Sequence, residues 1–301
     1  MYHKNETTLF EPRHESEYLG QFIPLHYHHN MLMDEYRMKG FKEAIDYVVF
    51  PHAKVLELGG GTGALSWFAA TKAEKVWCVE WNIELVTEAN RLLSMNAFGN
   101  RVEVVHDDAF VYLPPEPVDI VICEMIHTAM LREKQVEVIN AFKERYLKHF
   151  GGPLPRFIPE AVIMAVQPLQ QDYHFKGFYA PIIQFQNALE IQEGTKEMAA
   201  PAIYSMLDFS QDTDIHIGWK GSFKIELGGV VNAFRFITKN VLAIKMETNS
   251  TIDWLNHYLV LPVATPLTVA AGTIINVSFN YQAGGSIQSL QDSLSVSIEN
   301  S

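Results

Sequence analysis

Two patterns of apolar and polar residues alternate along the chain between residues 53 and 158. Short apolar runs, typical of buried strands, are separated by segments in which apolar residues recur every three or four positions, as in helices. The expected strands cover 54–58, 75–79, 102–105 and 118–123, and the expected helices cover 63–72, 83–96 and 131–148. This pattern predicts an α/β fold with a doubly wound, Rossmann-like parallel sheet, which binds ligands at the carboxyl ends of its strands.

The pattern changes after Gly151-Gly152-Pro153 to short strands with turns between them, at 162–166, 215–219, 223–227, 233–237, 241–246, 258–261 and 274–279. Such spacing predicts an all-β, barrel-like second domain. Within it, the segment 177–208 has apolar residues at helical spacing and predicts a helical arm that contacts another surface. We therefore expect two domains, 1–158 and 159–301.

The chain before the first strand predicts two N-terminal helices within 17–49, interrupted at Pro24, which cannot continue a helix. His26, His28 and His29 crowd this interruption. No cysteine or close pair of carboxylates completes a metal site with them, so we expect no metal.

A glycine loop follows the first strand. The strand carries one carboxylate, Glu57, and leads into Gly59, Gly61 and Gly63 before a helix begins. Glycines at these positions let the backbone turn tightly and approach a ligand closely. The loop also satisfies a dinucleotide fingerprint, but a pyrophosphate would face Glu57 at close range. A cationic ligand without phosphate suits the carboxylate, and we predict that the loop binds S-adenosyl-L-methionine.

Two further acids stand at strand ends on the same edge. Glu80 ends the second strand, where it can accept hydrogen bonds from ribose hydroxyls, and Asp108 follows the third, where it can receive the adenine amino group. The role of Glu80 suits either cofactor. A Rossmann oxidoreductase therefore remains an alternative, disfavoured by Glu57 and by the lack of a separate catalytic His or Tyr-Lys pattern.

The composition of the chain limits which ligands it can bind and where in the cell it is expected. The chain has 301 residues and a formal net charge of −12, which argues against nucleic acid and is compatible with a cationic ligand. Cys78 and Cys123 lie in apolar strand patterns and are expected to be buried, reduced thiols. No apolar run is long enough for a membrane span, and the N-terminal residues contain no apolar signal core. We expect a cytoplasmic protein that does not bind membranes.

Glu124 ends the fourth strand, and Glu133 follows nine residues later. A loop that curls back would bring the two carboxylates together, where they could grip one guanidinium, a planar group that pairs with carboxylates bidentately. Alternatively, Glu133 begins a solvated helix with Arg132 and Lys134. The spacing alone leaves both interpretations open.

Taken together, these motifs resemble the protein arginine methyltransferases over most of the chain. The double-glutamate loop of that family matches Glu124 and Glu133, its glycine motif matches Glu57, Gly59, Gly61 and Gly63, and its ribose-binding acid matches Glu80. Its N-terminal helix motif matches His28, Met31, Leu32, Asp34, Glu35 and Arg37. The resemblance implies that Arg37 holds the carboxylate of the cofactor and that His28 and Met31 contribute to the same site.

The resemblance has further implications for assembly and substrate. Pro159 falls where the family passes from its cofactor domain to its β-barrel, and 177–208 falls where it inserts a dimerisation arm, which implies a homodimer. Tyr18 and Trp254 match positions near the acceptor. Met31 matches the residue usual in asymmetric dimethylators.

Two positions depart from the family pattern. Phe22 replaces the second tyrosine of an aromatic pair, and Asp253 stands where a histidine is usual, close to the aspartate matched by Asp34. Methyl transfer to a peptide arginine remains the expected reaction, with the proton received by Asp253 or Glu133. A small guanidino or amino compound as acceptor, and a cofactor-binding protein without catalysis, remain alternatives.

Overall fold

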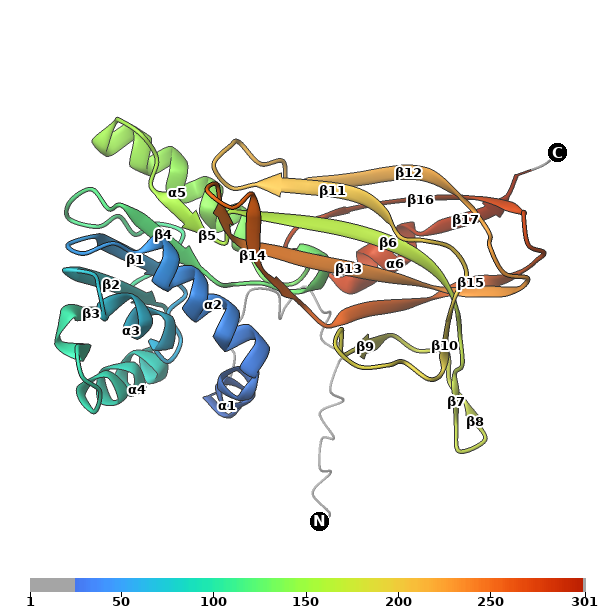
Figure 1. Ribbon diagram of the computed structural model, residues 1–301, viewed down its shortest axis with the longest axis horizontal. Coiled ribbons are helices and arrows are strands. Elements are labelled where there is room, and N and C mark those ends of the chain that lie inside the picture. The colour runs from blue at the N-terminus through green and yellow to red at the C-terminus, as the bar shows by residue number, and fades with distance from the viewer. Residues whose placement is uncertain (1–24, 300–301) are drawn as a thin grey trace, which may run out of the picture.

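The computed structural model describes residues 25–299 and confirms the α/β class. Figure 1 shows a helix-rich N-terminal domain at one end and a long, curled antiparallel sheet that extends away from it. The helices of the N-terminal domain are α1 (Leu25–Met33), α2 (Glu35–Val48), α3 (Ala64–Ala70), α4 (Ile83–Ser94) and α5 (Gln135–Phe150). Its strands are β1 (Lys54–Leu58), β2 (Lys75–Glu80), β3 (Val102–His106), β4 (Ile120–Cys123) and β5 (Arg156–Ile158).

The five strands form one parallel sheet in the order β3-β2-β1-β4-β5. The order reverses between β1 and β4, whose carboxyl ends carry Glu57 with the glycine loop and Glu124. Such a switch point is where open α/β sheets bind ligands. The fifth strand is absent from the sequence prediction because it spans only three residues and follows a Gly- and Pro-containing turn.

The β domain contains a seven-stranded sheet and a three-stranded sheet. Its elements are β6 (Ala161–Gln171), β7 (His174–Phe175), β8 (Phe178–Tyr179), β9 (Gln184–Gln186), β10 (Thr195–Glu197), β11 (Ala202–Asp208), β12 (His216–Lys224), β13 (Gly229–Lys245), β14 (Ser250–Leu255), β15 (Tyr258–Val269), β16 (Ile274–Gln282), α6 (Ile287–Ser293) and β17 (Ser295–Ile298). Because β5 ends at Ile158 and β6 begins at Ala161, the chain changes sheets where we place the domain boundary.

Two pairs of expected strands are single long strands. Segments 233–237 and 241–246 join in β13, since Thr238 and Asn240 are fully buried there instead of forming a turn. Segment 215–219 and the start of 223–227 join in β12, which ends at Lys224 and pairs with β16 along its whole length. The polar and glycine residues that resembled turns are therefore internal strand positions.

The prediction of a helical arm is wrong. Segment 177–208 contains β8 to β11 and no helix. Strand β9 pairs with β15, and β10 and β11 pair with β6, so sheet edges supply the backbone hydrogen bonds that a helix would have made internally. Pro181, Gly194 and Pro201 interrupt the helical spacing, and the neighbouring strands override it.

The N-terminal helices are only partly as expected. Helix α1 begins directly after Pro24, and the segment expected to form a first helix lies outside the described residues. A break that was not predicted occurs at Asp34, whose side chain caps α2 by accepting a hydrogen bond from the Arg37 amide (2.9 Å). No helix of residues 25–299 has both the length and the hydropathy needed to cross a membrane.

Candidate active site

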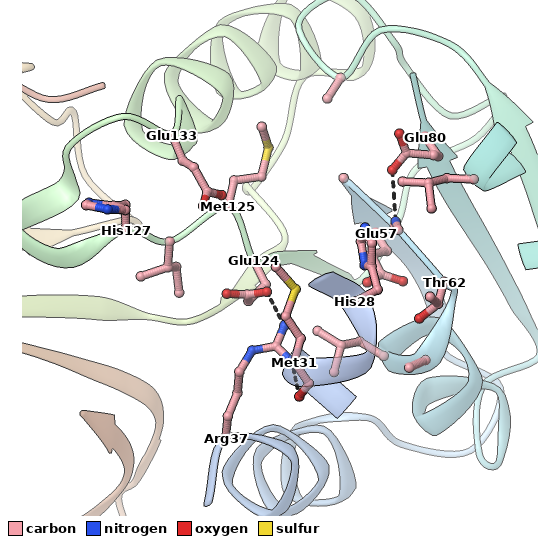
Figure 2. Close-up of a pocket in the computed structure, with 18 of the residues that line it drawn as sticks. His28, Met31, Arg37, Glu57, Thr62, Glu80, Glu124, Met125, His127 and Glu133 are labelled. Carbon is pink, nitrogen blue, oxygen red and sulfur yellow. Dashed lines mark hydrogen bonds and ion pairs between the residues drawn. The ribbon is translucent and has the colours of Figure 1, made fainter. Parts of the chain in front are cut away.

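A cavity of about 800 Å³ opens at the carboxyl ends of β1, β2 and β4. Helices α1 and α2 border it, and Trp254 reaches it from the β domain. Its lining contains the predicted residues His28, Met31, Arg37, Glu57, Gly59, Gly61, Glu80, Asp108, Glu124, Glu133 and Trp254. Residues from widely separated positions of the sequence thus meet in one site (Figure 2), to which the β domain adds Trp254.

The glycine loop has the left-handed backbone that the sequence predicted. Gly59, Gly61 and Gly63 have φ values of 78°, 54° and 77°. A Cβ on Gly61 would lie 2.8 Å from the imidazole of His28, and one on Gly59 would lie 3.0 Å from Met125. Gly63 does not line the cavity and caps the N-terminus of α3. The loop is therefore closely packed, and side chains at 59 or 61 would push on the cavity wall.

Glu57 lies buried beneath this loop. One of its oxygens accepts hydrogen bonds from the amide (2.8 Å) and the hydroxyl of Ser66. Burial, with a smaller contribution from the charge of Glu124, raises the pKa of Glu57 to about 8, although the hydrogen bonds of Ser66 and the charge of Arg37 act in the opposite direction. A buried carboxyl with too little positive charge around it favours a cationic ligand over an anionic one.

Glu80 holds the loop from the next strand. Its two oxygens accept hydrogen bonds from the amides of Gly61 (2.9 Å) and Asn82 (2.8 Å). Each carboxylate oxygen can accept a second hydrogen bond. Asp108 accepts one from the Phe110 amide (2.8 Å). Both acids line the cavity at the strand ends where the sequence placed them.

Arg37 crosses the floor of the cavity. Its guanidinium donates to Glu124 and, more weakly, to the carbonyl of Met31 (3.3 Å), and its Cζ lies 5.9 Å from the centre of the Trp254 ring. Burial opposes the charge, but the proximity of Glu124 dominates and the pKa of Arg37 is raised above its ordinary value. Figure 2 shows this pair between α2 and the end of β4.

Glu133 faces the same cavity. Burial, together with the charge of Glu124, raises its pKa to about 8, although Arg37 and Arg132 act in the opposite direction. It lies in the loop before α5, which begins only at Gln135. The loop thus curls back, and the solvated-helix alternative does not describe Glu133.

Two wall residues were not anticipated from the sequence. His127 lies between the two glutamates and packs edge-on against Phe185 of β9, with ring centres 5.6 Å apart. Burial lowers the pKa of His127 to about 4, so its ring is neutral at physiological pH. His127 could have been identified from the sequence, because it is an imidazole within the loop between the two glutamates. Phe185 could not, because its place in the cavity wall depends on the pairing of β9 with β15.

A family model described as a methyltransferase domain matches residues 55–151. Protein arginine N-methyltransferase 2 of Xenopus tropicalis is 32% identical over 156 residues, which are 50% of this chain and 36% of that protein. This chain is a methyltransferase related to the protein arginine N-methyltransferases. A methyltransferase domain implies S-adenosylmethionine as the methyl donor.

Relatives and structures extend the match beyond the methyltransferase domain. An uncharacterized protein of Methanocaldococcus jannaschii is 28% identical over 269 residues, covering 89% of this methyltransferase and 96% of that protein. The Trypanosoma brucei PRMT1 enzyme-prozyme heterotetrameric complex with AdoHcy aligns with a TM-score of 0.71 at 17% identity, covering 91% of this chain and 92% of that one. Arabidopsis thaliana protein arginine methyltransferase 10 aligns with 0.71 at 18% identity, covering 88% and 89%. These structures share the two-part fold.

Asp253 of the methyltransferase does not join the predicted site. Its carboxylate pairs with Lys239 (2.8 Å) and accepts a hydrogen bond from Thr251 (2.9 Å), and it is absent from the described cavity lining. Asp34 caps α2, so the two acids have separate partners. Neighbouring residues on a strand face opposite sides, and Trp254 is the one that reaches the cavity.

The remaining predictions concern metals, thiols and Tyr18. Among residues 25–299 of the methyltransferase, no group of three or more His, Cys, Asp or Glu side chains could hold a metal ion. Cys78 and Cys123 are buried, free thiols, and burial raises the pKa of both. Tyr18 and Phe22 lie outside the described residues.

Proposed function

We propose that this methyltransferase transfers a methyl group from S-adenosylmethionine to a guanidino nitrogen of arginine in a protein or peptide. The observation that carries the proposal is the meeting of Glu124 and Glu133 in one cavity, where Glu124 already pairs with a guanidinium, that of Arg37. Two carboxylates around a planar cation provide charge and bidentate geometry for an arginine side chain.

The cavity also fits the cofactor. Gly59 and Gly61 leave room against His28 and Met125, and Glu57 is a carboxyl whose pKa is raised mainly by burial, so that a bound cation would stabilise its charged form. Glu80 would hold the ribose hydroxyls and Asp108 the adenine amino group. Arg37 would hold the amino-acid carboxylate, with His28 and Met31 beside it, and Gly63 would support the loop from the start of α3.

The main contribution of the protein to methyl transfer is to orient the acceptor relative to the cofactor. When bound, S-adenosylmethionine supplies an electrophilic methyl group on a positively charged sulfur. Glu124 and Glu133 hold the acceptor guanidinium so that one nitrogen faces that methyl group, and their negative charges favour electron density on it. The positive charge of the bound guanidinium lowers the pKa of Glu133 from about 8, so that Glu133 is a carboxylate in the complex. Transfer of the methyl group to the guanidinium leaves two positive charges on the acceptor, and loss of one proton to the Glu133 carboxylate gives the singly charged methylguanidinium. Asp253 faces away and is not needed for this step.

The test is transfer of labelled methyl groups from S-adenosylmethionine into a proteome extract, followed by identification of the modified residue. Label on arginine in wild-type protein, and its loss in Glu133→Gln, supports the proposal. Label on another residue type contradicts it. Cofactor binding by calorimetry without any transfer would indicate a non-catalytic homologue.

A small guanidino compound is the second candidate acceptor. The two glutamates contact a guanidinium alone, so the clamp does not by itself distinguish a peptide from a small molecule. A mass-spectrometric screen of arginine peptides against small guanidines at equal concentration separates the two. A higher kcat/KM for a free guanidine than for the peptides would favour the small-molecule reaction.

We further propose that the enzyme is a homodimer assembled through 177–208. Although this segment is not helical, it exposes a row of large apolar side chains, Phe178, Ile182, Leu189 and Ile191, the last with 93% of its surface accessible. Exposed apolar surface of this kind is typical of an interface. The support is this exposure and the position of the segment in the family resemblance.

A further inference from the structure

The loop between the two glutamates has an unusual backbone. Ala129, Met130 and Arg132 have φ values of 58°, 54° and 62°, in the left-handed region that residues with a Cβ rarely adopt. Such conformations persist only where surrounding groups hold them. Ala129 and Met130 are completely buried, so the groups that hold them are within the protein.

Both peptide groups of Ala129 are held by side chains of the β domain. Its amide donates a hydrogen bond to Thr238 Oγ1 of β13 (2.7 Å), and its carbonyl accepts one from the Tyr281 hydroxyl of β16 (2.9 Å). Thr238 is fully buried and Tyr281 nearly so. The strained residue is therefore clamped by two strands that lie more than 100 residues later in the chain.

The neighbouring loop residues are held by the backbone of the same domain. Thr128 donates its hydroxyl proton to the His257 carbonyl (2.7 Å). The Met130 carbonyl accepts from the Gly284 amide (2.7 Å), and the Arg132 amide donates to the Gly285 carbonyl (2.8 Å). The β domain thus contacts the loop on both sides of Ala129.

This anchoring affects the position of Glu133 more than the position of Glu124. Glu124 directly follows β4, so the parallel sheet fixes its position. Glu133 is placed by the course of the loop, in which its own amide donates to the Leu131 carbonyl (2.6 Å). Displacement of Ala129 would therefore change the separation of the two carboxylates while leaving the glycine loop and Glu80 in place.

We propose that Thr238 and Tyr281 are positioning residues of the methyl-transfer site, and that the β domain sets the place of Glu133 relative to Glu124 by holding Ala129. Neither residue touches the cavity, and each acts through the loop backbone. The inference rests on the proposed function for its kinetic consequence. Its structural consequence, a loop held by two hydroxyl groups, can be tested without it.

Four variants form two matched pairs. Thr238→Val keeps the shape of the side chain and removes the acceptor oxygen, whereas Thr238→Ser keeps the hydroxyl group. Tyr281→Phe removes the donor to Ala129. Tyr204→Phe is its control, because the Tyr204 hydroxyl lies 3.0 Å from that of Tyr281 in the same buried cluster but has no hydrogen bond to Ala129.

The kinetic experiment measures methyl transfer to Nα-acetyl-L-arginine amide and the dissociation constant of S-adenosylmethionine. We expect Thr238→Val and Tyr281→Phe to lower kcat/KM for this acceptor about tenfold or more, with cofactor affinity within about twofold of wild type. Thr238→Ser and Tyr204→Phe should stay within about threefold in both. Equal losses in Tyr204→Phe and Tyr281→Phe, or parallel losses of transfer and cofactor affinity, would overturn the proposal.

Hydrogen exchange separates this inference from the proposed function. In Thr238→Val, amides of residues 125–134 should exchange about tenfold faster or more, while those of β1, β2 and β6 keep wild-type protection. If wild-type protein transfers no methyl group to any guanidine but this exchange pattern appears, the reaction is wrong and the anchoring stands. Unchanged exchange in the loop would overturn the anchoring whatever the reaction.

Discussion

The guanidinium of Arg37 is paired with the carboxylate of Glu124, 87 residues away in the sequence. We propose that both residues bind ligands, Arg37 the carboxylate of the cofactor and Glu124 the guanidinium of the acceptor. In the structure each is the partner of the other. Each ligand therefore binds one member of the same ion pair, so binding of either ligand must affect binding of the other.

We expect the cofactor to promote binding of the acceptor. Without it, an acceptor guanidinium competes with Arg37 for Glu124 and meets a like charge. S-adenosylhomocysteine keeps the amino-acid carboxylate and lacks the sulfonium charge, so it should draw Arg37 toward itself. Calorimetry with Nα-acetyl-L-arginine amide should show about tenfold or tighter binding in its presence, about 1.4 kcal/mol. Equal affinity with and without S-adenosylhomocysteine would contradict this coupling.

The stability of the free enzyme should decrease as pH rises from about 6.5 to 8.5. Burial raises the pKa of Glu57 and Glu133 from 4.5 to about 8, so in this range the folded protein binds more protons than the unfolded chain. His127, whose pKa is lowered to about 4, acts in the opposite direction only below its ordinary value of 6.5. Thermal unfolding across this range measures the effect.

The cofactor should reverse this trend. A bound cation lowers the pKa of a neighbouring carboxyl, so binding at pH 7 releases protons and strengthens as pH rises toward 8. Calorimetry in buffers of different ionisation enthalpy counts the released protons. In Glu57→Gln the count should decrease and the pH dependence of unfolding should flatten. Proton uptake on binding would show that the sign is wrong.

Sequence reasoning located the candidate site because most of it is encoded locally. Glu57, Glu80 and Glu124 each lie at or next to the carboxyl end of a strand, and parallel strands bring these ends to one edge. The glycine loop needs only the conformational freedom of its own residues. Position along a strand was therefore enough to place these side chains together.

The parts that were not predicted depend on contacts between distant segments. Segment 177–208 has helical spacing, yet it forms strands because β6 and β15 offer free edges. Asp253 was expected in the site, but its place on β14 turns it toward Lys239. The hydrogen bond from Ala129 to Thr238 joins residues 109 positions apart, and no local sequence pattern predicts it.

Replacing Glu80 by alanine should weaken cofactor binding. The carboxylate supports Gly61 and is proposed to accept ribose hydroxyls, and hydrogen bonds to a charged group contribute roughly 1.5 to 3 kcal/mol, or roughly 10- to 150-fold in affinity. Glu84→Ala is the control, since Glu84 is an exposed carboxylate at the start of α4 and does not line the cavity. Calorimetric affinity in Glu80→Ala equal to that of the control would remove Glu80 from the site.

The proposed homodimer should dissociate when its apolar segment acquires a charge. Ile191→Asp places a carboxylate on the most exposed apolar side chain of 177–208. Met246→Asp is matched to it, because Met246 is 81% exposed but lies in the turn between β13 and β14. Sedimentation at micromolar concentration should give a dimer for wild type and Met246→Asp, and a monomer for Ile191→Asp. A wild-type monomer would end the proposal.

The glutamate pair gives the most decisive prediction. Glu133→Gln keeps the size of the side chain and one acceptor oxygen but removes its charge, so the acceptor guanidinium loses one charge-assisted pair and keeps Glu124. Transition-state stabilisation should fall by about 2 to 4 kcal/mol, or roughly thirty- to a thousand-fold in the rate of transfer. Glu124→Gln should lower the rate to a similar extent and also release Arg37, its partner in the free enzyme.

The double variant tests whether the two residues hold one group. If they do, Glu124→Gln combined with Glu133→Gln should cost less than the sum of the single changes, because the second loss acts on a guanidinium that is already poorly held. Cofactor affinity should change little in Glu133→Gln, since Glu133 is proposed to contact the acceptor alone. Transfer rates and cofactor affinities for the three variants decide the matter, and near-normal turnover in Glu133→Gln would show that the two carboxylates do not form a clamp.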